Sequence, residues 1–242
     1  AKFGHAHLNY LLAIEDFDGG FKLKAVRYKK GRALQHTVVG TMMRLDLDEP
    51  LRPGKSVSFE IEWSHKVLDA KTIWARGGYE HFVEAGNKVY TIAQWFPRMA
   101  VYNDVTGWQN KAFLGRGEFA LELGDYAVEI TVPADHVVGA TGELQNPGKV
   151  LSSLQRKRLE RARTAAKPAF IINEAEAKEA EKSKATGKKT WVFEAENVRD
   201  FAFASSRKFI WDAWGVDTGP KKEGGRKTMA MSFYPKEAEP LW

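Results

Sequence analysis

Polar and apolar residues alternate with a period of two over much of the chain between Leu23 and Val138. The alternation is clear in the segments TMMRLDLDEPL, SVSFEIEW and YAVEITVP. Because successive side chains of a strand point to opposite faces, this pattern predicts half-buried β-strands. Between the first two segments, EPLRPGKS holds two prolines and a glycine. That composition predicts a turn that joins them as antiparallel strands. VVGATGEL is predicted to be a buried strand broken at Gly142.

The pattern changes after Asn146-Pro147. The segment from Ser152 to Ala166 has a serine able to cap a helix, followed by strong helix formers, and Pro168 comes soon afterwards. These features predict a helix that ends before the proline. The charged segment EAEAKEAEKSKATGKK has too few apolar residues to form a core. Residues 152–189 are therefore predicted to be a helical, charged insertion. Within it, a short strand over Ala169–Ile172 is expected to pair with a strand over Thr190–Ala195.

Many short strands separated by turn signals predict a mainly β protein. The expected architecture is a large curved antiparallel sheet, or a β-sandwich-like saddle domain, carrying the short helical and charged insertion. No internal repeat interrupts this organisation.

The composition limits the classes of function that this chain can have. The 242 residues include 43% hydrophobic side chains, enough for a substantial core, and no apolar run that would span a membrane. The absence of cysteine excludes disulfides, thiolate zinc sites and cysteine nucleophiles in this chain. The net charge of +6 would suit a nucleic-acid partner, but the basic residues are spread along the chain. The densest clusters, Arg156–Arg163 and Lys221–Lys227, lie in predicted exposed helix or loop, which favours a solvated basic surface and no nucleic-acid partner.

The familiar catalytic patterns are missing from the sequence. No HExxH motif occurs, so the helix-borne pair of zinc ligands with its adjacent glutamate base is absent. His5 and His7 would share one face of a strand, but no third metal ligand lies near them in the sequence. We therefore predict no catalytic residue and no metal ligand in this chain.

The segment YTIAQWFPRMAVYNDVTGWQN, Tyr90 to Asn110, is unusually dense in aromatic rings. Gln94 and Arg98 are the residues within it that can make directional contacts. Asp104 is a candidate ion partner for Arg98, and a buried Arg–Asp pair under aromatic cover is a common structural feature. The residues by themselves leave open whether Gln94 serves binding or packing.

Several long segments are similar to the amino-terminal β domain of bacterial M1-family metallopeptidases, the zinc aminopeptidases of the gluzincin group. They are YTIAQWFPRMAVYNDVTGWQNKAFLGRGEFALELGDYAVEITVPADHVVGATGELQNP, MRLDLDEPLRPGKSVSFEIEW, TWVFEAENVRDFAFASSRKFIWDA and MAMSFYPKEAEPLW. The resemblance extends from about Leu23 to Trp242.

The resemblance implies that residues 1–242 are the N-terminal β domain of such a peptidase, truncated at its start. Residues 211–242 would then lead to a catalytic domain that this chain does not contain. That domain would hold one zinc ion through HExxH and a downstream glutamate, so zinc is expected in the full-length protein and no cofactor in this fragment. The implied partners are a peptide substrate, bound through the missing domain, and that domain itself, packed against this one. Members of this kind are often exported or associated with the cell envelope.

One substrate contact follows from the resemblance. In the family, a Thr-Gln pair on the β domain precedes a Phe-Pro segment, and its glutamine faces the cleft and helps to bind the terminal amine of the peptide. Here the pair is Ala93-Gln94, followed by Trp95-Phe96-Pro97, so the glutamine is retained and the threonine is not. Gln94 is the expected substrate-binding residue. Two other functions stay open: a scaffold domain of an inactive peptidase homologue, and a free-standing peptide- or carbohydrate-binding β module.

Overall fold

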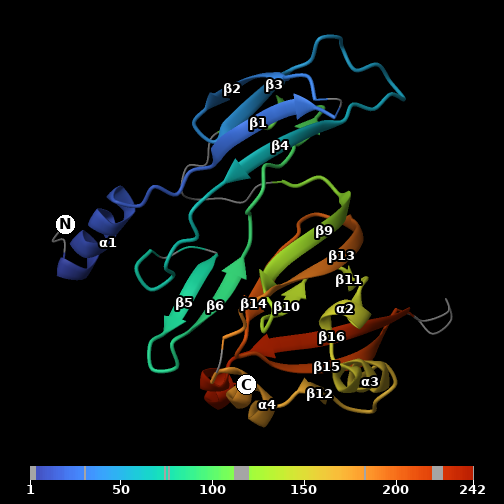
Figure 1. Ribbon diagram of the computed structural model, residues 1–242. Coiled ribbons are helices and arrows are strands. Elements are labelled where there is room, and N and C mark those ends of the chain that lie inside the picture. The colour runs from blue at the N-terminus through green and yellow to red at the C-terminus, as the bar shows by residue number, and fades with distance from the viewer. Residues whose placement is uncertain are drawn as a thin grey trace. The chain divides into compact units, whose positions relative to one another are not determined.

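The computed structural model describes residues 4–29, 31–73, 75, 77–111, 120–182, 184–219 and 226–241 (Figure 1). The prediction of a mainly β protein is confirmed, because the strands form several antiparallel sheets and the helices are few and short. The chain divides into two compact units, residues 1–68 with 97–122 (unit 1) and residues 69–96 with 123–242 (unit 2). Among the described residues, no helix is both long and apolar enough to cross a membrane.

Unit 1 is built from two-stranded antiparallel sheets. β1 pairs with β4, β2 with β3, and β7 with β8. Val26 on β1 and Leu34 just before β2 are its most deeply buried apolar residues, at 7% and 2% exposure. The elements are α1 (His5–Glu15), β1 (Lys22–Tyr28), β2 (Gln35–Val39), β3 (Met42–Asp46), β4 (Phe59–Ser64), β7 (Tyr102–Asn103) and β8 (Gly107–Trp108).

The predicted hairpin between the MRLDLDE and SFEIEW strands is wrong, although both strands exist. β3 pairs with β2, and β4 pairs with β1. The alternation of side chains identifies a strand but not its partner. Gly40, with φ +57°, lies in the two-residue connection between β2 and β3. Such a short connection favours pairing between the two strands that it joins. EPLRPGKS is instead part of a longer loop from Leu47 to Val57.

The segment that contains His5 and His7 is helical, not extended. It forms α1, in which residues two positions apart point to different sides of the helix. The strand expected for this segment is therefore wrong.

Unit 2 contains three antiparallel sheets. Their strand orders are β10-β14-β6-β5, β11-β13-β9 and β12-β15-β16. The strands are β5 (Gly78–Phe82), β6 (Asn87–Ile92), β9 (Gly124–Pro133), β10 (Val137–Ala140), β11 (Glu143–Leu144), β12 (Ala169–Ile172), β13 (Lys188–Val198), β14 (Phe203–Ser206), β15 (Ile210–Thr218) and β16 (Arg226–Tyr234). The helices are α2 (Pro147–Val150), α3 (Ser153–Ala162), α4 (Glu174–Ala180) and the 3-10 helix η2 (Lys236–Leu241). The segment expected to lead out of the domain, 211–242, thus contributes most of β15, then β16 and η2.

The predicted helix after Ser152 is present as α3. Ser152 caps it in a capping box with Gln155, but the helix ends at Ala162, before the predicted Ala166. The charged segment that follows contains a second capped helix, α4, whose box pairs Asn173 with Glu176. Arg158 of α3 donates to both Glu176 and the carbonyl of Ile171, so the two helices and β12 are tied together.

The predicted pairing of the strand over Ala169–Ile172 is also wrong. β12 pairs with β15, while the strand over Thr190–Ala195 belongs to β13. Both edges of β13 are already occupied, by β9 and by β11. The N–H and carbonyl groups of Val192 also bond to Asn146 and Gln145, the residues that follow β11, so β12 cannot pair there.

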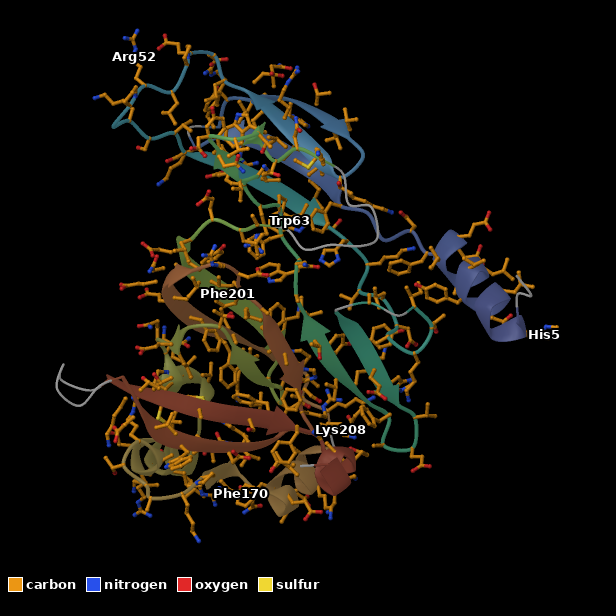
Figure 2. All side chains as sticks on the ribbon, turned by 180° about the vertical axis from the view of Figure 1, so that it is seen from behind. His5, Arg52, Trp63, Phe170, Phe201 and Lys208 are labelled. Atoms are coloured by element: carbon orange, nitrogen blue, oxygen red, sulfur yellow. The ribbon has the colours of Figure 1, made fainter. Side chains whose placement is uncertain are left out.

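One apolar cluster forms the core of unit 2. Its most deeply buried large side chains include Trp191 and Phe201, at 1% and 0% exposure, and Figure 2 labels Phe201. The buried members are Ile130, Val138, Val150, Leu151, Ala162, Ile171, Ile172, Ala177, Trp191, Phe193, Phe201, Ile210, Trp211 and Ala213.

A turn rich in buried polar groups connects β14 to β15. Arg207 Nε donates to Asp135 at 2.8 Å, and its guanidinium also donates to the side chain of Asn87 at 2.9 Å. Lys208 is fully buried, with its ammonium 2.7 Å from Glu237 and 3.9 Å from the centroid of the Phe82 ring. Both cations are therefore held by segments distant in sequence.

The Lys208 ammonium also lies 3.6 Å from Oε1 of Glu181, an oxygen that makes no hydrogen bond. The other carboxylate oxygen of Glu181 accepts from Lys236 at 2.7 Å. Burial, ion pairing and ring contact together link α4, η2 and the end of β5 around one ammonium.

The predicted break at Gly142 is confirmed. β10 ends at Ala140 and β11 begins at Glu143, and Gly142 between them has φ +87°. A Cβ added to Gly142 would lie 2.2 Å from the carbonyl oxygen of Glu194. Both its backbone angle and its close contact with β13 therefore require glycine.

Replacing Gly142 by Ala should destabilise unit 2 severely. We expect a loss of about 3 kcal/mol or more in the free energy of unfolding, because left-handed strain and a backbone clash add together. Gly86→Ala is the matched control, since Gly86 has φ +61° but open space around its Cα. That variant should lose only about 1 kcal/mol. Urea unfolding measures both, and equal losses would contradict the close contact.

Candidate functional site

Gln94 lies at a corner where β6 has just ended. β6 is held on both sides, with Ile92 paired to Phe203 of β14 and Thr91 paired to Gly78 of β5. Two residues later the backbone of Gln94 adopts φ +53°, in the left-handed region. Glutamine rarely occupies that region, and holding it there costs about 1–3 kcal/mol unless the surroundings fix the conformation.

The aromatic residues after Gln94 fix that corner. Trp95 Nε1 donates to the carbonyl oxygen of Phe201 at 3.0 Å. The Trp95 ring meets Phe96 and Phe203 edge to face, at centroid distances of 5.1 and 5.7 Å. Phe96 in turn packs edge to face on Tyr126 at 5.8 Å. The backbone on the C-terminal side of Gln94 is thus anchored in the core of unit 2.

The Gln94 side chain itself is exposed, and the structure records no hydrogen bond for it. Just before β5, a Cβ on Gly77 would come within 3.0 Å of the Thr91 carbonyl oxygen, so the chain passes closely beside the end of β6. An amide on a rigid, strained corner, with its donor and acceptor free for an external group, is the geometry of a binding contact.

The aromatic-rich segment of the sequence separates into two environments. Trp95 and Phe96 are packed in unit 2, as the packing hypothesis predicts. Tyr102 and Trp108 belong to the β7–β8 hairpin of unit 1 and are 61% and 54% exposed. The two rings face each other across the hairpin, edge to face at 5.3 Å, but solvent reaches both of them. Packing therefore explains only the first half of the segment.

Asn103 shapes the tip of this hairpin. Its side-chain oxygen accepts from the backbone N–H groups of Val105 and Thr106, at 3.1 and 2.8 Å. The ion pair of Arg98 with Asp104 stays a prediction. Within the described residues, no group of three or more His, Cys, Asp or Glu is placed to hold a metal ion.

His136, in the turn before β10, is a buried imidazole whose pKa is lowered. It is 7% exposed, and its Nδ1 lies 2.9 Å from the Ser205 hydroxyl. Burial and then the nearby positive charge of Arg207 lower the pKa of His136 below its usual value, while Asp135 opposes the shift. Burial raises the pKa of Asp135, but hydrogen bonds from Arg207 and the Ala185 N–H outweigh it and hold that pKa low. This pairing of Ser with His is closed to solvent and stabilises the fold.

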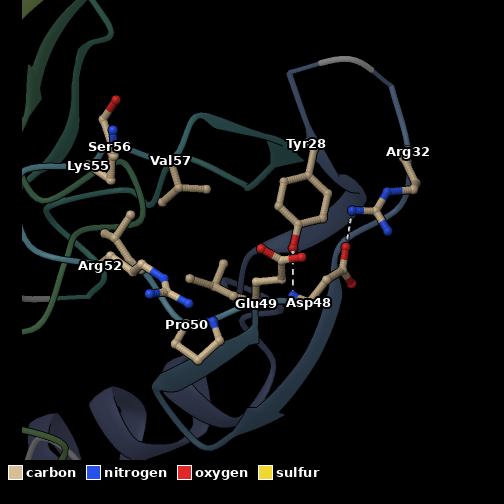
Figure 3. Close-up of a pocket in the computed structure, with 11 residues that line it drawn as sticks. Tyr28, Arg32, Asp48, Glu49, Pro50, Arg52, Lys55, Ser56 and Val57 are labelled. Atoms are coloured by element: carbon tan, nitrogen blue, oxygen red, sulfur yellow. Dashed lines mark hydrogen bonds and ion pairs between the residues drawn. The ribbon is translucent and has the colours of Figure 1, made fainter.

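Unit 1 contains a surface pocket of about 410 Å³ that the sequence did not reveal (Figure 3). It lies between Tyr28, at the end of β1, and the loop from Leu47 to Val57. The residues that line it are Tyr28, Arg32, Leu47, Asp48, Glu49, Pro50, Leu51, Arg52, Lys55, Ser56 and Val57. EPLRPGKS was correctly identified as turn chemistry, but its residues line a pocket because β3 and β4 do not pair with each other.

Comparison of the chain with protein-family models, curated proteins and solved structures finds no match. The candidate sites therefore depend on geometry and on the resemblance described above.

The stability of unit 2 should fall as the pH drops below the ordinary histidine pKa of about 6.5. The unfolded chain takes up a proton on His136 there, while the folded chain resists it because its pKa is lowered. The stabilisation is present above that pH and is lost as the pH falls through the folded pKa, at no more than about 1.4 kcal/mol per pH unit. Urea unfolding between pH 7.5 and pH 5, values chosen to span roughly the histidine range, measures the effect.

His136→Asn is the control for this prediction, because asparagine retains a polar atom near the position of Nδ1. Its unfolding free energy should lack the histidine contribution in that pH range. Asp135 and Glu176, whose pKa values are lowered, lose their contributions only at more acidic pH. An unchanged pH profile in the variant would contradict the assignment to His136.

Proposed function

We propose that this chain is the N-terminal β domain of an M1-like zinc aminopeptidase, an enzyme that removes N-terminal residues from peptides. In this proposal Gln94 borders the catalytic cleft and contacts the terminal amine of the substrate. The resemblance of the sequence supports the family, and the exposed, strained and anchored corner at Gln94 supports the contact. The strained corner is the single observation that carries the role of Gln94.

An amide is suited to this contact. The side-chain oxygen of Gln94 accepts a hydrogen bond from the ammonium of a peptide, without the desolvation cost of a buried carboxylate. The zinc ion, bound outside this chain, would polarise the scissile carbonyl and activate a water molecule. Gln94 would act by holding the peptide terminus in register with that centre, so its role is binding and positioning.

The rigidity of the corner matters for this role. Trp95 and Phe96 fix the backbone after Gln94, so the side chain starts from few conformations and loses little entropy when it binds. Glycine would adopt φ +53° without strain, yet the position holds a glutamine. A side chain retained at such a position points to use of the amide.

Removing the amide should weaken catalysis in the full-length protein. We expect Gln94→Ala to lower kcat/KM for aminoacyl substrates by about 1–3 kcal/mol in transition-state terms, the value of a hydrogen bond to a charged group. Gln94→Gly should show the same kinetic loss while its folded state is as stable as the wild type or more so, because the strain is relieved. Steady-state kinetics and thermal unfolding of both variants separate the two effects.

Gln35→Ala is the matched control, since Gln35 is an exposed glutamine on β2. Its kinetics should equal those of the wild type. Unchanged kcat/KM in both Gln94 variants would eliminate the proposed contact. Activity that neither zinc removal nor any Gln94 variant affects would eliminate the family as well.

The exposed hairpin favours a second candidate function. Tyr102 and Trp108 present aromatic surface to solvent, next to the polar groups of Gln109 and Asn110. This is the chemistry of a module that binds a peptide or a carbohydrate. Under this alternative, Trp108→Ala and not Gln94→Ala would abolish ligand binding.

A further inference from the structure

We propose that the pocket of unit 1 binds the anionic group of a small molecule, a carboxylate or a phosphate, between Arg52 and Lys55. The rest of the ligand would lie on the apolar residues of the same pocket. This inference is independent of the proposed peptidase function, because every residue of the pocket belongs to unit 1 and Gln94 does not.

A tight turn places Arg52 and Lys55 close together along the backbone. The Lys55 N–H donates to the Arg52 carbonyl at 3.1 Å, which closes a four-residue turn with Pro53 and Gly54 at its centre. Gly54 has φ +73°, as the third residue of a type II turn requires, and proline favours the second position. In such a turn the first and fourth Cα atoms are less than about 7 Å apart. The turn therefore brings the backbone positions of Arg52 and Lys55 close together.

Among the residues that the structure describes, these two cations have no anionic partner. The structure records no ion pair or side-chain hydrogen bond for Arg52 or Lys55, and every residue of the pocket is described. Arg32 and Asp48, in contrast, form an ion pair with each other, and the Asp48 N–H donates to the Tyr28 hydroxyl at 3.1 Å. Two like charges on one turn, without a counterion among the described residues, favour an anion from outside.

The Arg32 side of the pocket is fixed by its own contacts. The Arg32 guanidinium lies 4.6 Å from the centroid of the Tyr28 ring, and Figure 3 shows its ion pair with Asp48. The charge of Arg32 is therefore already paired with a carboxylate of the protein. The Arg52 guanidinium instead extends into the pocket, beside Pro50 (Figure 3).

The walls and the volume indicate the size of the ligand. Leu47, Pro50, Leu51 and Val57 supply apolar surface, and Tyr28 supplies an aromatic ring. About 410 Å³ lies within the range of small-molecule pockets. The arrangement fits an anion that carries a small apolar or aromatic group.

Glu49 is the remaining charge of the pocket. Its carboxylate lines the same pocket as Arg52 and Lys55, so it repels an anionic ligand. Removing this charge should strengthen binding, whereas a purely structural role of the loop predicts no such gain. Glu49→Gln is therefore a diagnostic variant.

The test is a titration of the isotopically labelled chain followed by its amide NMR signals. The probes are phenyl phosphate, benzoate and inorganic phosphate. We expect saturable shifts of the signals from the Leu47–Val57 loop with phenyl phosphate or benzoate, at about millimolar affinity, as for a solvent-exposed site with few contacts. Added salt should weaken the binding. If only one of the two aromatic probes binds, it identifies the anion as phosphate or carboxylate.

The matched variants decide the role of each charge. The double substitution Arg52→Ser with Lys55→Ser should weaken binding at least about tenfold, and Glu49→Gln should strengthen it severalfold. Lys157→Ser with Arg161→Ser removes the same net charge from exposed positions one turn apart on α3 and should leave affinity unchanged. Unchanged spectra outside the loop show that each variant is folded.

Three results would overturn the proposal. The first is the absence of saturable shifts with every probe, and the second is equal weakening by the two double substitutions. The third is equal affinity for inorganic phosphate and phenyl phosphate, which would remove the role of the apolar walls. None of these results bears on Gln94, so this proposal and the peptidase proposal fail separately.

Discussion

Unit 2 depends on the burial of two cations in the turn between β14 and β15. Arg207 and Lys208 leave water only because partners from distant segments surround them: Asp135 and Asn87 for the first, Glu181 and Glu237 for the second. Breaking such a pair on one side costs about 3–5 kcal/mol, because the other charge remains buried. The sheets, α4 and η2 must therefore come together in one register.

The same strand register also sets the position of Gln94, the candidate substrate contact. β14 leads into this turn and pairs with β6, whose end sets the position of Gln94. Phe201, just before β14, accepts the hydrogen bond from Trp95 and packs in the core. A single strand therefore connects the buried charges to the corner that carries the exposed amide, and it explains how a strained backbone angle is held there.

Local chemistry could be predicted from the sequence, and long-range pairing could not. The cap at Ser152 and the break at Gly142 were predicted because each depends on a few adjacent residues. The partners of β3 and β12 were predicted wrongly, since alternation is the same whichever strand lies alongside. The ion partners of Lys208 come from residues 27 or more positions away, and no local pattern marks them.

The two candidate sites show the same difference between local features, which the sequence predicts, and long-range arrangement, which it does not. Gln94 was singled out by its resemblance to a family motif, but its left-handed backbone and exposed side chain appeared only in the structure. The pocket at Arg52 and Lys55 was missed, although its turn was recognised from Pro53 and Gly54. A turn motif predicts where the chain reverses. Which residues then line a cavity depends on the strands that flank it.

The central claim is that the chain belongs to a zinc aminopeptidase, and the most direct test is to read the coding sequence beyond the codon for Trp242. The account predicts an HExxH motif followed by a glutamate ligand, preceded by a glycine-rich loop of the GxMEN type. A stop codon, or a downstream region without those ligands, would contradict it and would leave a binding or scaffold domain.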